Sequence, residues 1–276
     1  QKPYNPSSMI QMQAMIKLDG STLFLGAFFF TIQIYGDFSG YSDIAIGCAR
    51  LFGIDLMQNF KYPYFSRDIA EFWRRWHISL TTWFRDYIYI PLGGSRAGKW
   101  KSFRNTLVIF LVSGFWHGAN WTFVAWGAYH ALLFLPLLLL GQNRRYRDSV
   151  AENSFLPSVK ELTQMGVTFL LVLLGWILFR SEDISQAAVY LERMFNASLF
   201  SAPQLVGLGF GQLLLKKCFF FTALMFVVEW IGRKQAHGLM IEDLSLPVRY
   251  VIYTVLLIII YGFDASNPQG FIYFQF

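Results

Sequence analysis

The segment Leu111-Val-Ser-Gly-Phe-Trp-His-Gly-Ala-Asn-Trp121 decides the fold of this chain. It lies within 39 consecutive uncharged residues that run from Asn105 to Asn143. As one straight helix this run would be about 58 Å long at ~1.5 Å per residue, whereas the apolar core of a bilayer is only about 30 Å thick. The run must therefore turn, and we predict that it breaks into a helix pair in the region of Gly114, Gly118 and Gly127.

Such a break places His117 deep in apolar sequence, between Trp116 and Trp121 and directly before Gly118. An ionisable side chain at membrane depth is costly, and by default it marks a functional site. We therefore predict that His117 carries chemistry. A structural alternative stays open, in which the ring donates a hydrogen bond to a backbone carbonyl that the helix break leaves free.

The composition is typical of a polytopic membrane protein. Hydrophobic residues make up 55% of the 276 residues and charged residues only 14%, and several apolar runs approach spanning length. We predict an all-α fold with about six transmembrane or re-entrant helices and further amphipathic helices at the interface, in a single domain over residues 1–276. Because the chain starts at Gln1 rather than Met, we read it as the C-terminal part of a longer protein.

The net charge of +6 is unevenly distributed, since nine of the 23 Lys and Arg residues lie between Lys61 and Arg104. Beside membrane spans, such clusters mark the cytoplasmic side and attract anionic headgroups. We predict that this segment is cytoplasmic and that the chain binds membrane lipids rather than nucleic acid. The sequence carries neither a phosphate-binding loop nor metal-ligand spacing, so we expect no metal and no resident cofactor.

Residues 67–88 show the clearest helical periodicity, with aromatic and aliphatic side chains on one face and mostly polar ones on the other. The pattern predicts one basic amphipathic helix, suited to the membrane surface or to a groove in the protein. His77 falls at the margin between the two faces, where a proton-transfer group or a ligand contact would lie. An interfacial, hydrogen-bonded histidine is the alternative.

A polar segment, Gly36-Asp-Phe-Ser-Gly-Tyr-Ser-Asp43, interrupts another apolar run. The carboxylates of Asp37 and Asp43 would face protein or water rather than lipid. They would either line a substrate path, or bond free amides and pair with an arginine.

Four segments occur in a fixed order: Tyr35-Gly-Asp-Phe-Ser-Gly-Tyr-Ser-Asp-Ile-Ala-Ile-Gly47, Glu71-Phe-Trp-Arg-Arg-Trp-His-Ile-Ser-Leu80, Trp83-Phe-Arg-Asp-Tyr-Ile-Tyr-Ile-Pro-Leu-Gly-Gly94 and Phe115-Trp-His-Gly-Ala-Asn120. Together they resemble the membrane-bound O-acyltransferase (MBOAT) family, and most closely its bacterial alginate O-acetyltransferase branch. The resemblance runs from about residue 20 to residue 185.

This resemblance implies a multi-pass enzyme of the bacterial cytoplasmic (inner) membrane, with His117 as the catalytic histidine and His77 as the second, upstream one. An acetyl group would pass from a cytoplasmic thioester, with acetyl-CoA as the expected donor, to an acceptor on the outer side. A periplasmic or surface acetyltransferase partner would then place it on a cell-envelope polymer, either a polysaccharide or peptidoglycan. In this mechanism His117 acts as a general base, and His77 orients the thioester or stabilises the developing oxyanion.

We expect substrate contacts from further residues of the same motifs, namely Trp76, Trp116, Asn120, Arg74, Arg75, Asp37 and Asp43. The two arginines would attract the phosphates of coenzyme A, or else bind lipid headgroups. Other functions stay open at this point. They are D-alanyl transfer to teichoic acid from a carrier protein, a transporter with a His and Asp relay, and a non-enzymatic scaffold that recruits a secreted enzyme.

Overall fold

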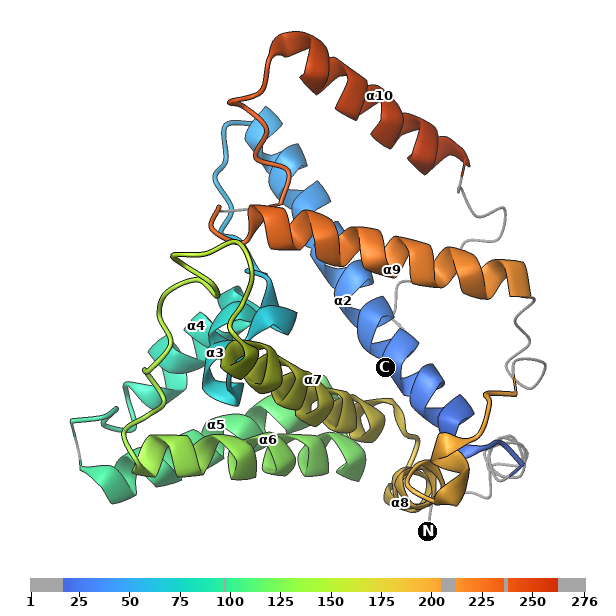
Figure 1. The fold of residues 1–276 in the computed structure, drawn as a ribbon. Coiled ribbons are helices and arrows are strands. Elements are labelled where there is room, and N and C mark those ends of the chain that lie inside the picture. Colours follow the sequence, from blue (N-terminus) through green and yellow to red (C-terminus); the bar gives the residue numbers. More distant parts are fainter. Residues whose placement is uncertain (1–16, 97, 205–211, 236–237, 263–276) are drawn as a thin grey trace.

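The computed structural model of the chain describes residues 17–96, 98–204, 212–235 and 238–262 (Figure 1). Every regular element within these ranges is helical, which agrees with the predicted all-α class. The α-helices are α2 (Gly20–Leu51), α3 (Ile69–Arg75), α4 (Ile78–Phe84), α5 (Lys99–His117), α6 (Trp121–Leu139), α7 (Val159–Arg180), α8 (Ile184–Met194), α9 (Gln212–Gly232) and α10 (Leu246–Gly262). A π-helical turn, Arg85–Tyr89, follows α4, and short 3-10 turns lie at Pro63–Phe65 and Ala197–Phe200.

The predicted break in the uncharged run is confirmed, because α5 ends at His117 and α6 begins at Trp121. The side chain of Asn120 accepts a hydrogen bond from the backbone N–H of Thr122 at 3.3 Å and so caps α6. The two helices then lie side by side in Figure 1.

Gly114 and Gly127 lie inside these helices rather than at the break. A Cβ on Gly114 would stand 2.3 Å from the carbonyl oxygen of Phe123, and one on Gly127 would stand 2.2 Å from that of Phe110. Both glycines therefore allow the backbones of α5 and α6 to touch, which holds the end of α5 firmly against α6.

The predicted single helix over residues 67–88 is wrong, because the chain forms two seven-residue helices, α3 and α4, that are interrupted before and at His77. The cause is Asn59, whose backbone carbonyl accepts from Ile78 N at 2.9 Å. Its side-chain Oδ1 accepts from the backbone N and the Oγ of Ser79, at 3.1 Å and 2.5 Å. These bonds replace helical ones, and His77 adopts a left-handed φ of 44°, which is uncommon for a non-glycine residue.

The core behind this junction is aromatic. Trp76 at the junction, Trp126 of α6 and Trp176 of α7 are each at most 2% exposed. Trp126 and Trp176 stack with ring centroids 6.0 Å apart, and Trp76 lies 5.0 Å from Trp176. Full burial of one such side chain contributes roughly 1.5–3 kcal/mol or more, so the three rings anchor the α3–α4 junction to α6 and α7.

Two described helices, α6 and α7, are long and apolar enough to cross a membrane by length and composition. The helix α10 is also apolar but has only 17 residues. The helices α2 and α9 have 32 and 21 residues and lie over two more apolar runs of the sequence. The total of about six spans remains a prediction.

Candidate functional site

A cavity of about 480 Å³ lies between the α3–α4 junction and helices α5, α6 and α7. His77 and His117 both line it, although 40 positions separate them in the sequence. Trp73 and the three tryptophans of the aromatic core form much of its wall. We call this space the histidine cavity. The structure thus brings together the two histidines that the sequence singled out.

His117 is the last residue of α5 and is half-buried among aromatic rings. Its ring centroid lies 5.2 Å from that of Trp126 and 5.0 Å from that of Phe179, at interplanar angles of 87° and 80°. Edge-to-face contacts of this kind fix the orientation of the ring.

His77 lies outside the long helices, and its ring is oriented by Ser79. The Ser79 Oγ donates to Asn59 Oδ1, so towards His77 Nδ1, 3.4 Å away, it can only accept. The proton of the neutral ring therefore sits on Nδ1, and Nε2 keeps a lone pair. Burial lowers the pKa of His77 to about 4, so the ring is neutral at physiological pH.

The solvent-exposed part of the histidine cavity carries positive charge. Arg74, Arg85 and Arg144 are all exposed and all line it. Arg74 donates to the backbone carbonyls of Asn143 and Tyr146, both at 2.5 Å, which holds its guanidinium at the rim. Arg85 pairs with Asp86 at 2.7 Å. The arrangement presents guanidinium groups to any anionic part of a ligand that enters.

Arg75, the second arginine expected to contact substrate, does not line this cavity. Its guanidinium donates to Glu71 Oε1 at 2.6 Å and to the backbone carbonyl of Asp148 at 3.1 Å. The polar face predicted for residues 67–88 is therefore buried at these two positions rather than exposed to solvent, since Glu71 is only 1% exposed and Arg75 only 9%. Buried charges of opposite sign satisfy one another, which the local pattern does not reveal.

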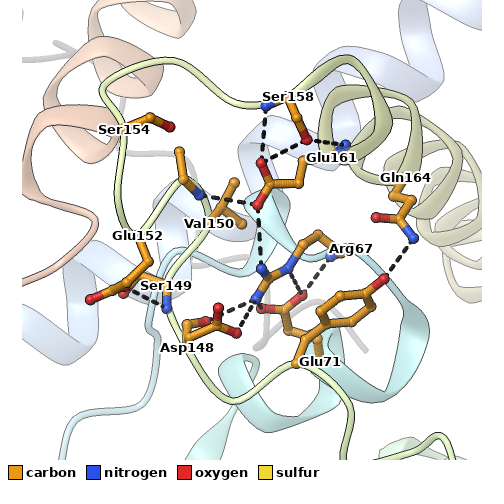
Figure 2. A network of polar contacts seen from close by, with 12 residues as sticks. Arg67, Glu71, Asp148, Ser149, Val150, Glu152, Ser154, Ser158, Glu161 and Gln164 are labelled. Carbon is orange, nitrogen blue, oxygen red and sulfur yellow. Dashed lines mark hydrogen bonds and ion pairs between the residues drawn. The ribbon is translucent and has the colours of Figure 1, made fainter.

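Glu71 and Arg67 form the centre of the network in Figure 2. Two nitrogens of the Arg67 guanidinium donate to the Glu71 carboxylate at 3.0 Å and 3.1 Å. Arg67 also reaches Asp148 at 3.0 Å and Glu161 at 3.4 Å. The network ties α3 to the loop after α6 and to the first turn of α7, and so holds the helix that leads into His77.

Most of the other expected contacts lie elsewhere. Trp116 is 57% exposed and does not line the histidine cavity, whereas Trp76 does. Asn120 caps α6, and its Nδ2 donates to the backbone carbonyl of Glu182 at 2.7 Å. Asp37 and Asp43 lie on α2, which runs unbroken through the polar segment. Asp37 is exposed, and Asp43 lines a different cavity.

The sequence reasoning missed His130 of α6, which is completely buried. Its ring centroid lies 5.0 Å from that of Trp73 and 5.1 Å from that of Trp126, directly behind the cavity wall. Within the described part of the chain, neither ring nitrogen has a hydrogen-bond partner. The available signal was a second histidine in the same uncharged run.

Comparison with known proteins gives consistent matches. Residues 8–151 match the model of MBOAT, the membrane-bound O-acyltransferase family. A probable alginate O-acetylase of Pseudomonas aeruginosa is 43% identical over 196 residues, which cover 69% of this chain and 36% of that protein. A peptidoglycan O-acetyltransferase of Helicobacter pylori is 40% identical over 165 residues, which cover 60% of this chain and 30% of that protein.

A teichoic acid D-alanyltransferase of Bacillus subtilis is 30% identical over 176 residues, which cover 60% of this chain and 42% of that protein. The chain therefore spans between 30% and 42% of the length of these curated relatives.

Proposed function

Since the chain belongs to the membrane-bound O-acyltransferase family, we propose that it moves an acetyl group from a cytoplasmic thioester to an extracytoplasmic acceptor. The transfer would serve O-acetylation of a cell-envelope polysaccharide or of peptidoglycan, the polymers named for two of its relatives. The protein would act as a multi-pass protein of the bacterial inner membrane. A periplasmic or surface acetyltransferase would take the acetyl group onward.

The observation that carries this proposal is the histidine cavity, which joins two histidines at a tryptophan wall to an arginine-bearing rim. A thioester carried on a phosphorylated arm needs both features. Its phosphates would be attracted by guanidinium groups in solvent, and its reacting carbonyl must reach a base that water does not surround.

We assign the base to His117. A neutral ring nitrogen takes the proton of the acceptor hydroxyl while the oxygen attacks the thioester carbonyl carbon. The tetrahedral intermediate then collapses, the C–S bond breaks, and the leaving thiolate takes the proton from His117. A positioned base of this kind accelerates transfer by about 10² to 10⁴-fold.

Of the two roles considered for His77, orientation of the donor fits its hydrogen bonding better. With the proton on Nδ1, Nε2 accepts, and it can hold an amide N–H of the thioester arm. Oxyanion stabilisation would need an N–H at that position. The indole N–H groups of Trp73, Trp126 and Trp176 have no acceptor among the described residues, and we propose them as donors to the oxyanion.

Acetyl-CoA is the donor we propose, with Arg74, Arg85 and Arg144 near its phosphates. Binding of lipid headgroups at the same rim is the competing role of these arginines. Charge reversal by Arg144→Glu separates the two. It should raise the KM for acetyl-CoA several-fold if the donor binds there, whereas an unchanged KM would leave headgroup binding as the role of these arginines.

The test of the proposed function compares His117→Ala with His117→Gln, at equal membrane protein level. Both should abolish O-acetylation of the envelope polymer, because neither side chain can accept the proton. If the ring were only structural, glutamine could still hydrogen-bond a free backbone group and should restore function. Normal acetylation in His117→Gln would therefore refute the catalytic assignment.

D-alanyl transfer to teichoic acid is a second candidate, favoured by the match to the Bacillus subtilis protein. Membranes that contain the chain can be given acetyl-CoA or a D-alanyl carrier-protein thioester in parallel. Consumption of the second donor and not the first would replace the acetyl proposal with this one.

A further inference from the structure

A second cavity, of about 640 Å³, lies between α2, α9, α10 and the segment that precedes Pro63. The helix α2 and the segment before Pro63 each turn one face towards it. Residues at 35, 39, 43, 46 and 50 of α2 follow helical spacing, and every second residue from 56 to 62 contributes, as in an extended chain. We call this space the acidic cavity, because Asp43 and Glu229 line it.

The acidic cavity is separate from the histidine cavity. Tyr35 and Phe60 line the acidic cavity, and Trp76 lines the other. The ring centroid of Trp76 lies 5.9 Å from that of Tyr35 and 5.0 Å from that of Phe60. The two cavities are therefore divided by aromatic rings in contact, with Trp76 facing the histidine cavity and Tyr35 and Phe60 facing the acidic cavity.

Two polar groups of the acidic cavity lack the hydrogen bonds that buried groups almost always have. Tyr35 OH donates to Glu229 Oε1, but Glu229 Oε2 is shielded from water and has no partner among the described residues. The hydroxyl of Tyr62, a residue only 4% exposed, is also buried and has no hydrogen-bond partner among the described residues. A ligand with N–H or O–H donors would satisfy the carboxylate oxygen, and the phenol can accept or donate.

The cavity-facing side of α2 carries one negative and one positive side chain. Asp43 and Arg50 lie on the same face, two helical turns or about 10.5 Å apart along the axis. Much of the remaining wall is apolar, with Leu56, Leu224 and Leu256 among its members. The helices α9 and α10 also expose apolar side chains along their length, which suits acyl chains.

We propose that the acidic cavity binds the headgroup of a phospholipid that carries a primary ammonium. The ammonium donates to Glu229 Oε2 near Tyr62, with Asp43 as a second negative charge. The phosphate lies towards Arg50. A quaternary ammonium has no N–H to donate, so a choline headgroup of the same net charge leaves the Glu229 oxygen unpaired.

The test is native mass spectrometry of the detergent-solubilised chain, titrated in parallel with dioleoyl phosphatidylethanolamine, phosphatidylcholine and phosphatidylglycerol. Phosphatidylethanolamine should bind at least tenfold more tightly than the other two. Glu229→Gln, which keeps an acceptor for Tyr35 OH, should remove that preference. Tyr62→Phe should weaken it several-fold.

The matched control is Glu242→Gln, which removes an exposed carboxylate in the loop before α10 and should leave the preference intact. Equal binding of phosphatidylethanolamine and phosphatidylcholine overturns the proposal. So does unchanged selectivity in Glu229→Gln. Free phosphoethanolamine that competes as well as the lipid would overturn the lipid assignment. The readout is binding, so it does not depend on acyl transfer.

Discussion

Replacement of Glu71 by glutamine tests whether the buried ion network holds the α3–α4 junction in place. Glu71→Gln keeps the size and one acceptor oxygen but removes the negative charge between Arg67 and Arg75. Arg67 retains Asp148 and Glu161. Arg75, with 11% of its side chain exposed, retains only the backbone carbonyl of Asp148 among the described residues. One guanidinium is left uncompensated.

Removal of one partner of a buried ion pair costs about 3–5 kcal/mol. Because glutamine still accepts one hydrogen bond and Arg67 stays paired, we expect the lower end, about 3 kcal/mol. At about 2–4 °C per kcal/mol for a chain of this size, the thermal midpoint in detergent should fall by at least about 6 °C. Differential scanning fluorimetry of the purified protein measures it.

The control is Glu152→Gln in the neighbouring loop, since Glu152 is exposed and its carboxylate accepts, among the described residues, only from Ser149 N at 3.1 Å. Its free energy of unfolding should change by less than about 0.5 kcal/mol. Adding Arg75→Gln to Glu71→Gln should recover part of the loss, because no unpaired charge then remains. Equal shifts for Glu71→Gln and Glu152→Gln would show that the network does not stabilise this junction.

Four further outcomes are expected. His77→Ala should retain measurable acetyl transfer at equal expression, and a loss as complete as that of a His117 variant would mean that the two act as a unit. Burial lowers the pKa of His77 from 6.5 to about 4, so the unfolded chain binds the proton at a higher pH than the folded chain does. The free energy of unfolding should therefore fall as the pH drops from about 6.5 to 4, and it should fall less in His77→Gln. Gly127→Ala should destabilise by about 1–3 kcal/mol, because its Cβ meets the backbone of α5, whereas Gly166→Ala, with open space around it, should be neutral or stabilising. Ser95→Cys, in a variant without the two native cysteines, should react with an impermeant maleimide only from the cytoplasmic side, and labelling in intact cells from outside would reverse the orientation.

Local features of the sequence determined much of the helical framework. The uncharged run from Asn105 to Asn143 is too long for one span, and this length alone predicted the break that the structure has after His117. Apolar runs that approach spanning length likewise predicted transmembrane helices, and α6 and α7 are long and apolar enough to be such helices. Both signals are local, because hydrophobic length and periodicity depend on residues close together in the chain.

Tertiary contacts alone decided the shape of the site. The periodicity of residues 67–88 predicted a continuous helix, but Asn59 takes the N–H groups that would continue it and turns His77 into the histidine cavity. The pairing of Arg67 with Asp148 could not be predicted either, because 81 positions separate the two residues in the sequence. This pairing withdraws Arg67 and its neighbours from solvent. The helical period records which face of a segment is apolar, but not which distant polar group will compete for its backbone or neutralise its charge. For that reason the two histidines were identifiable from the sequence, whereas the cavity that joins them was not.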